Sequence, residues 1–201
     1  MAFAYLDPAA PLDHVPSPNR SEGSPAGSRD PLPEMSGTRR PVDLLAIAEG
    51  FAESAPGIAE LHGRRERSWV LLAVTDLFEA WAIGWPPGGK IELHDHGQSH
   101  GAVVVAVGSL IETTIRATAS GVALISTQHV EAGGHRRFGP GYVHDLSNDG
   151  DARAVSVHVY GPRLTTMSYY ELDPRGRLDV VRTEDVPPVG PFDTTSEHDP
   201  S

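Results

Sequence analysis

Residues 154–160 are Ala-Val-Ser-Val-His-Val-Tyr, and this stretch is the strongest indication of fold class in the sequence. Valines alternate with Ser156, His158 and Tyr160. Because successive side chains of a strand point to opposite faces, the stretch predicts a β-strand with one apolar and one polar face. On the outside of a sheet this would be ordinary alternation, whereas in a small barrel inward polar groups line a ligand cavity.

Other β-branched or aromatic runs lie on both sides of this strand, separated by Gly, Pro, Asn and Asp. Strands at this spacing predict an all-β sandwich or barrel. Residues 41–60 differ, because their apolar residues are spaced as in a helix and Gly50 and Pro56 interrupt them, which predicts one or two short helices. The further strands are expected at residues 69–74, 79–85, 102–107, 112–118, 121–126, 165–172 and 177–181.

The two ends of the 201-residue chain have a different composition from its middle. Residues 1–40 and 184–201 are rich in Pro, Ser, Gly and acidic residues and have no periodic apolar pattern, so we expect both to be disordered. One folded domain is therefore predicted over residues 41–183, flanked by a disordered N-terminal segment and a disordered acidic tail.

Composition limits the function classes. A formal net charge of −11, from 16 Lys and Arg against 27 Asp and Glu, argues against a nucleic-acid partner and favours a small molecule. No apolar run approaches the roughly 20 residues of a membrane span, and the first residues do not resemble a secretory signal, so a soluble, cytoplasmic protein without membrane contact is expected. The chain has no cysteine, so any metal must be bound through His, Asp or Glu.

Among ten histidines, the His94-Asp95-His96 cluster is the first candidate for chemistry. In a strand the two histidines share a face and Asp95 points the other way, which suits two imidazoles that converge on one metal ion. Two solvent-facing histidines on an edge strand would give the same pattern, so the pair alone does not decide between the two interpretations.

The surrounding residues resemble the two motifs of the cupin barrels. The first is matched by Gly88, His94-x-His96 and Gly108, except that Gly101 stands where the motif usually has glutamate. The second is matched by Gly133 and Gly141-Tyr-Val-His144-x-x-x-Asn148. The chain is most similar to the cysteine dioxygenase-like (thiol dioxygenase) cupins, of the bacterial type, over residues 67–172. The similarity lies in Trp85-Pro-Pro-Gly-Gly with Leu93-His-Asp-His-Gly-Gln-Ser99, in Tyr142-Val-His144-Asp, and in Ser156-Val-His158-Val-Tyr160-Gly-Pro162 followed by Met167-Ser-Tyr-Tyr-Glu171.

This resemblance implies a double-stranded β-helix, or jelly-roll, with a mononuclear Fe²⁺ held by His94, His96 and His144. Three neutral imidazoles also suit another first-row metal such as nickel, and they leave positions free for substrate and oxygen. A structural histidine near a turn is the other interpretation of His144. The resemblance further implies a hydrogen-bonded relay in which Tyr160 is the inner group facing substrate and oxygen, His158 the proton-sharing middle and Ser156 the outer anchor.

The sequence departs from the family at two positions. The animal enzymes have a cysteine that is cross-linked to the relay tyrosine, and Gly101 stands there, so no cross-link can form. The arginine that holds the substrate carboxylate is expected on the strand before Trp85, where this chain has Leu71. Arg67 and Arg163 are candidate replacements and are equally plausible as solvated surface charges, and His100 is a further candidate contact to substrate or oxygen. Trp81 and Trp85 are predicted to pack in the core, and lining of the pocket is the other interpretation of either.

We therefore expect an iron-dependent enzyme that oxidises a small thiol, in the first place L-cysteine to its sulfinate, with O₂. One alternative is a related metal-dependent cupin that oxidises or rearranges the sulfur of cysteine or of another thiol in a biosynthetic pathway. A second is a non-catalytic metal-binding cupin, against which the relay argues. The expected partners are the thiol and O₂, and the expected state is a monomer or small homo-oligomer.

Overall fold

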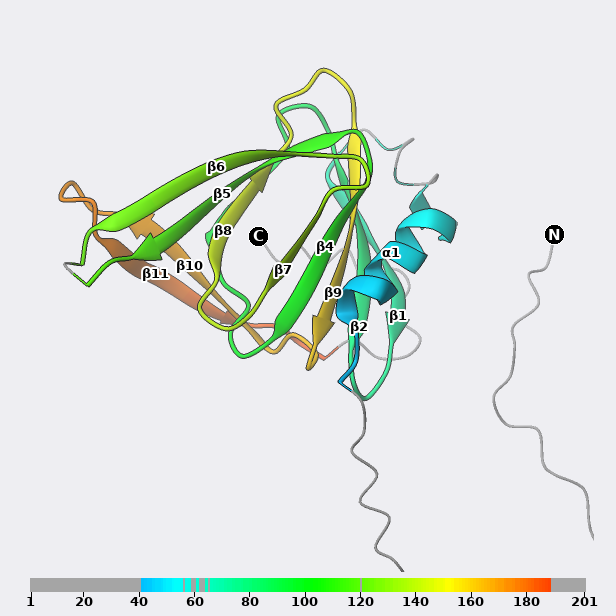
Figure 1. Ribbon diagram of the computed structural model, residues 1–201, viewed down its shortest axis with the longest axis horizontal. Coiled ribbons are helices and arrows are strands. Elements are labelled where there is room, and N and C mark those ends of the chain that lie inside the picture. The colour runs from blue at the N-terminus through cyan, green and yellow to red at the C-terminus, as the bar shows by residue number, and fades with distance from the viewer. Residues whose placement is uncertain are drawn as a thin grey trace, which may run out of the picture. The chain divides into compact units, whose positions relative to one another are not determined.

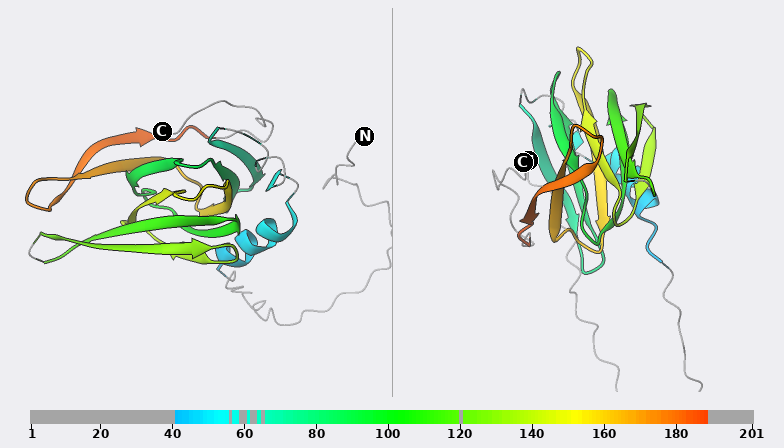
Figure 2. Two further views of the ribbon diagram at one scale, coloured as in Figure 1. Left: turned by 90° about the horizontal axis from the view of Figure 1, so that it is seen from above. Right: turned by 90° about the vertical axis from the view of Figure 1, so that its left-hand side faces the viewer.

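The computed structural model describes residues 41–55, 57–58, 61, 64, 66–119 and 121–188. These residues form two antiparallel sheets that face each other (Figures 1 and 2), which confirms the predicted all-β class. In spatial order the five-stranded sheet contains β1 (Ser68–Val74), β2 (Glu79–Trp85), β9 (Ala154–Gly161), β4 (His100–Val107) and β7 (His135–Phe138). The six-stranded sheet contains β11 (Leu178–Asp185), β10 (Thr166–Leu172), β3 (Lys90–His94), β8 (Val143–Ser147), β5 (Ser109–Ala117) and β6 (Ala123–Glu131).

Each of the eight strands expected from the sequence overlaps an observed strand, with ends that differ by a few residues. The three strands without a matching apolar run are β3, β7 and β8. Each is only four or five residues long and contains charged residues or histidine, so none has the β-branched pattern that identifies a strand. Two of these short strands, β3 and β8, supply metal-ligand candidates.

Helix α1 (Leu44–Ser54) lies within the helical region predicted over residues 41–60. The Asp43 side chain caps its first turn by accepting a hydrogen bond from the Ala46 amide at 3.3 Å. The helix ends before Ala55, whose extended backbone is expected of a residue that precedes proline. Leu45 and Ala48 are its buried side chains, and α1 packs on the outer face of the five-stranded sheet (Figure 1).

Strand β9 lies at the centre of the five-stranded sheet, between β2 and β4. Its valines Val157 and Val159 pack outward in the cluster that contains Leu45 and Ala48 of α1. Its polar residues are on the opposite, inward face, and His158 and Tyr160 line a cavity. Of the two interpretations that the alternation allowed, the cavity-lining one therefore applies to β9.

The end of the domain lies later than the expected boundary at residue 183. Strand β11 continues to Asp185, and Val186 donates a backbone hydrogen bond to Thr165 at 2.8 Å. The predicted disordered N-terminal segment and the tail beyond residue 188 lie outside the described residues. Among the helices of the described part, none is long and apolar enough to cross a membrane.

Candidate metal centre and cavity

A cavity of about 360 Å³ lies between the two sheets. Its walls are mostly apolar and include three tryptophans, and five of its lining side chains are polar or charged. The polar set combines two histidines, a tyrosine, an arginine and a glutamate, so the cavity can hold a small molecule with groups of opposite charge. The lining residues are Arg67, Trp69, Glu79, Trp81, Ile83, Trp85, Ile91, His94, Leu146, His158, Tyr160, Leu164, Met167, Val186, Pro187 and Pro188.

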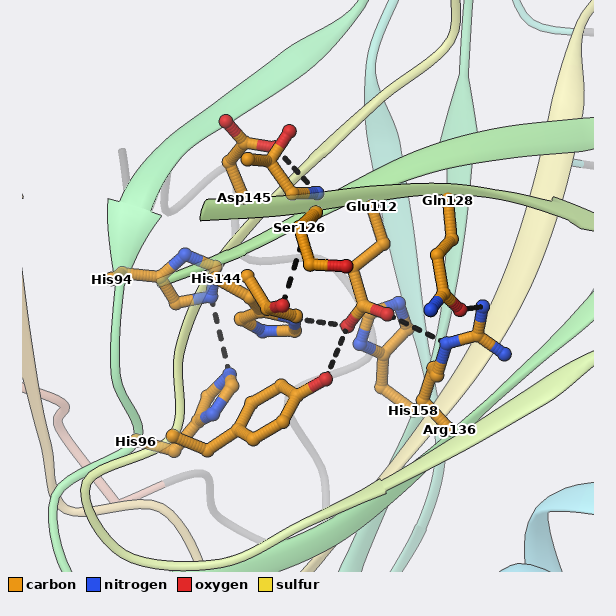
Figure 3. A network of polar contacts seen from close by, with 12 residues as sticks. His94, His96, Glu112, Ser126, Gln128, Arg136, His144, Asp145 and His158 are labelled. Atoms are coloured by element: carbon orange, nitrogen blue, oxygen red, sulfur yellow. Dashed lines mark hydrogen bonds and ion pairs between the residues drawn. The ribbon is translucent and has the colours of Figure 1, made fainter. Parts of the chain in front are cut away.

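Three histidines converge beside this cavity. His94 ends β3, His96 lies in the following loop, and His144 is in β8, where it pairs directly with His94. The possible ligand atoms of the three lie within 4.8 Å of one another, and Nε2 of His94 is 3.2 Å from Nε2 of His96 (Figure 3). All three side chains are buried. The structure thus brings together the three residues expected as metal ligands.

The loop geometry at residues 94–97 explains why His94 and His96 converge although the strand ends at His94. Asp95 points away from the histidines, where its carboxylate accepts hydrogen bonds from the Gly97 amide at 3.0 Å and the Tyr170 hydroxyl at 2.7 Å. Gly97 has a φ of 56°, the left-handed conformation that glycine adopts without strain. The Asp95 contacts therefore fix the turn that directs both imidazoles inward.

The hydrogen bonds on the outer ring nitrogens leave the inner nitrogens as acceptors. Nδ1 of His94 lies 2.8 Å from the Glu92 carbonyl oxygen, and Nδ1 of His144 lies 2.8 Å from Oε1 of Glu112. Both partners only accept, so each Nδ1 bears a proton and each Nε2 presents a lone pair. Burial lowers the pKa of His94 and of His96 well below the ordinary value, with a smaller contribution from neighbouring imidazoles. Metal-free His94 and His96 are therefore neutral at physiological pH.

This arrangement fits a divalent first-row metal ion. Nε2 of His144 is buried without a hydrogen-bond partner, which is costly for a polar atom unless a ligand satisfies it. Among the described residues, His94, His96 and His144 are the one group of His, Asp or Glu side chains close enough to bind a metal together. Three neutral imidazoles without a carboxylate add no negative charge, so an anionic substrate group is a favourable further ligand.

Glu112 supports the ligand candidate His144, and sequence reasoning missed it. Only 2% exposed, the carboxylate accepts hydrogen bonds from His144, from the Tyr142 hydroxyl at 3.0 Å and from Arg136 Nε at 2.7 Å. Arg136 also donates to Gln128 at 2.7 Å (Figure 3). Burial raises the pKa of Glu112, but these three partners outweigh it and hold the pKa below the ordinary value. One signal was available: Glu112 shares a strand face with the apolar Leu110.

The predicted relay residues form a continuous hydrogen-bonded chain. The Tyr160 hydroxyl is 3.3 Å from Nδ1 of His158, whose Nε2 is 2.8 Å from Oγ of Ser156. The Trp85 indole N–H, which sequence analysis had assigned to packing, donates to Ser156 at 2.8 Å. Ser156 is fully buried, so its hydroxyl proton needs an acceptor, which Nε2 of His158 provides, and Nδ1–H of His158 then donates to Tyr160. The Tyr160 hydroxyl proton then remains available to the cavity.

Burial keeps the relay neutral. It lowers the pKa of His158 to about 3, with smaller contributions from His144 and Arg67, so the ring is uncharged at physiological pH. Burial together with the charge of Glu79 raises the pKa of Tyr160 above the ordinary value. The tyrosine is therefore a hydrogen-bond donor and a phenol, not a phenolate.

Comparison with known proteins assigns the chain to a family. The family model of cysteine dioxygenase type I matches residues 57–173, more than half of the chain. The chain belongs to the cysteine dioxygenase type I family. This confirms the predicted relationship and the cupin fold.

Solved structures with a similar fold are distant. An oxalate oxidase in complex with glycolate is 20% identical, with a TM-score of 0.43 over 50% of this chain and 53% of that one. A double-stranded β-helix protein from Klebsiella pneumoniae is 21% identical, with a TM-score of 0.42 over 51% and 80%. A Lactobacillus farciminis oxalate decarboxylase is 18% identical, with a TM-score of 0.43 over 60% and 32%. The chain thus spans about half of the oxalate oxidase and a third of the decarboxylase.

At Gly101, in this member of the cysteine dioxygenase type I family, an aromatic ring from another strand occupies the space beside the backbone. A Cβ added at Gly101 would overlap the Phe138 ring. Phe138 stacks on the ligand candidate His96, with ring centroids 4.5 Å apart, and its ring lies 5.9 Å from that of Tyr160. Glycine is thus required at position 101 because Phe138 packs there, against both His96 and Tyr160.

Of the three residues expected to contact substrate, one lines the cavity and two do not. Arg67 lines the cavity of this cysteine dioxygenase relative, with its guanidinium 4.9 Å from the Trp85 ring centroid. Arg163 lies beside the cavity, with Nε 3.7 Å from Oε2 of Glu79, and is not among the lining residues. His100 is exposed and lines a different hollow near α1. Arg67 is therefore the cationic side chain among the described lining residues.

Glu79 is the second residue that sequence analysis missed. It begins β2, pairs in register with Tyr160, lines the cavity and is 2% exposed. Oε1 accepts a hydrogen bond from the Leu164 amide at 3.3 Å. Burial raises the pKa of Glu79, against the lowering effects of Leu164, Trp81 and Arg163. A carboxyl group thus lines a cavity in which an arginine had been expected to bind a substrate carboxylate.

Proposed function

We propose that this protein is an Fe²⁺-dependent thiol dioxygenase that converts a small thiol, in the first place L-cysteine, to its sulfinate with O₂. The observation that supports this most strongly is the convergence of three buried imidazoles beside a cavity that Tyr160 also lines. Membership of the cysteine dioxygenase type I family supports the same reaction class.

The reaction is balanced without a further reductant. In R–SH + O₂ → R–SO₂⁻ + H⁺, the S–H bond and the O–O bond break and two S–O bonds form. Sulfur loses four electrons and O₂ gains four. When bound, iron would supply a Lewis acid that favours the thiolate and a redox centre that allows triplet O₂ to react.

The residues of the chain would bind and orient the substrate. His94, His96 and His144 would hold the metal, and the apolar cavity walls would keep bulk water from the reacting sulfur. The guanidinium of Arg67 would pair with a substrate carboxylate, a bond that is strong in a site shielded from water. The Tyr160 hydroxyl, fixed by His158, would donate a hydrogen bond to charge that develops on the reacting oxygen atoms.

Metal analysis followed by oxygen consumption tests the proposal. The full chain, loaded with Fe²⁺, should bind one iron per chain and consume one O₂ per L-cysteine, and both sulfinate oxygens should derive from ¹⁸O₂. Cysteamine, homocysteine and 3-mercaptopropionate complete the panel. The His144→Ala variant should lose bound iron. His135→Ala, which changes an exposed strand histidine, is its control. Iron-loaded protein that consumes no O₂ with any of these thiols would contradict the proposal.

A further inference from the structure

We propose that strand β6 is an interaction surface for a second copy of this chain, whose own β6 pairs with it antiparallel across a two-fold axis at Thr127. The pairing would join the six-stranded sheets of two copies into one continuous sheet. The inference is independent of the proposed reaction, because none of the metal-ligand candidates and none of the described cavity-lining residues belongs to β6.

Strand β6 is an exposed edge of the molecule. It is the last strand of the six-stranded sheet, with β5 on one side of it, and the β5–β6 hairpin projects away from α1 (Figure 1). Residues 124–129 are all exposed, and among them Leu124 is 60% and Ile125 58% exposed. An exposed edge that carries apolar side chains is a template for pairing with another strand.

The other three sheet edges of the described part have the features by which proteins block such pairing. Strand β11 has four charged residues among eight and a register shift against β10. Strand β7 has four residues, two of them arginines. Strand β1 is partly buried along its length and has a register shift against β2. Strand β6 has nine residues, pairs with β5 without a register shift, and has no Asp, Glu, Lys, Arg or Pro at residues 123–130.

Two backbone hydrogen bonds show which groups of β6 point away from β5. The Thr118 amide donates to the Val122 carbonyl at 3.0 Å, so every second residue from Val122 onward bonds to β5. The residues between them direct their N–H and C=O groups outward. Ala123 does so, because its amide donates to the Gly176 carbonyl in the β10–β11 turn at 2.9 Å.

Both ends of this outward row are already in use. The Ala123 amide is bound as described, and the Glu131 carbonyl accepts the Gly134 amide at 2.7 Å in the turn before β7. The backbone groups that remain to bind a partner strand are those of Ile125, Thr127 and His129.

These three residues are symmetric about Thr127, so an antiparallel second copy satisfies all of them. Each Thr127 would exchange two hydrogen bonds with its counterpart, and Ile125 of either copy would exchange two with His129 of the other. A shift in register would leave one of the three unpaired, or would oppose it to Ala123 or Glu131, where an outward group is in use. The edge is therefore complementary to itself in one register.

The side chains suit the same register. Leu124 would lie opposite Val130 of the second copy, and Glu131 would lie opposite Ala123, so no like charges face each other. This matters because the chain has a formal net charge of −11, and two copies repel each other wherever acidic side chains meet. The uncharged edge is the place where two copies can approach with least repulsion.

Cysteine cross-linking tests the register, because the chain has no cysteine of its own. In the proposed dimer the two Thr127 Cα atoms would be about 5.5 Å apart, which a disulfide can span. Under mild oxidation, full-length Thr127→Cys should therefore become a covalent dimer on a non-reducing gel. Val180→Cys, at an exposed position of β11, is the matched control and should remain a single chain. Equal cross-linking of the two variants would overturn the inference.

Sedimentation equilibrium of the iron-loaded full chain measures the association itself. We expect twice the mass of one chain at high concentration, with a dissociation constant of about 1–100 µM, as for a small interface. Thr127→Lys would place two ammonium groups opposite each other at the axis and should weaken association about tenfold or more. Thr127→Val keeps the backbone and the size of the side chain and should retain the association.

The remaining outcomes are also decisive. A chain that sediments as a monomer at about 200 µM overturns the inference and leaves β6 open to a different partner. A dimer that survives Thr127→Lys but dissociates in Val180→Lys would place the interface on β11 and overturn it as well. If Thr127→Lys does not fold, hydrogen exchange of the wild type replaces it. The Thr127 amide should exchange more slowly at high than at low protein concentration, and equal exchange would contradict the pairing.

Discussion

The two ends of the cavity differ in how their polar groups are satisfied. At the metal end, Glu112 receives three hydrogen bonds and Asp95 fixes the histidine loop, so the imidazoles are held in place before any ligand binds. At the substrate end, Arg67 and Glu79 stand among apolar walls, and the guanidinium nearest Glu79 lies 3.7 Å away. The difference teaches that a network of charged and polar hydrogen-bond partners holds the metal end in place, whereas the substrate end places an arginine and a glutamate among apolar side chains.

The largest effect should come from removing a metal ligand. His144→Ala, His94→Ala or His96→Ala leaves two imidazoles, so we expect bound metal and oxygen uptake to fall to background. Elemental analysis of the purified variants measures the first and an oxygen electrode the second. Retention of a full metal complement in His144→Ala would mean that a different residue is the third ligand.

The next effect concerns Tyr160, where the two ends of the cavity meet. Tyr160→Phe removes the hydroxyl that His158 orients and keeps the ring that packs on Phe138. Turnover should fall by roughly 10–1000-fold, the range for one catalytic hydrogen bond or proton donor, with metal content unchanged. Steady-state kinetics beside metal analysis gives the answer. Wild-type turnover in this variant would reduce the relay to a structural hydrogen-bond chain.

Rigidity of the metal end can be tested at Glu112. Glu112→Gln keeps an acceptor for the His144 N–H but removes the negative charge that strengthens the imidazole as a ligand. We expect metal affinity to decrease by about 10–100-fold, as is typical when the partner of a metal-bound histidine is changed. Competition with a chelator measures it, and Glu131→Gln controls for net charge. Equal affinity in the two variants would assign Glu112 to packing alone.

The smallest effect should appear at the substrate end. Arg67→Gln should raise KM for L-cysteine about tenfold and leave cysteamine, which has no carboxylate, nearly unchanged, because one charge-assisted bond is lost. Arg163→Gln is the paired variant in the same kinetic assay. A selective rise in KM for cysteine in Arg163→Gln and not in Arg67→Gln would show that Arg163 binds the carboxylate instead.

Features that depend on one strand could be predicted from the sequence, whereas features that depend on contacts between strands could not. Strand β9 was predictable because its alternation is local, and the direction of Ser156, His158 and Tyr160 followed from it. Glu112 could not be placed, since its contact with His144 depends on the pairing of β5 with β8, far apart in the chain. Glu79 and Arg67 faced the same limit: at the end of a strand or just before it, nothing local distinguishes a cavity-lining charge from a solvated one.

Val186, Pro187 and Pro188 form part of the cavity wall, although they follow the last strand of the barrel. The backbone bond from Val186 to Thr165 ties this segment to the loop after β9. A wall made from residues that follow the last strand can change in length and sequence without disturbing a single strand pairing. In evolution, the shape of the cavity can therefore diverge between relatives by changes in this segment, while the barrel and its three histidines stay the same. A variant truncated after residue 183 would lack Val186, Pro187 and Pro188 and would therefore lose this part of the cavity wall.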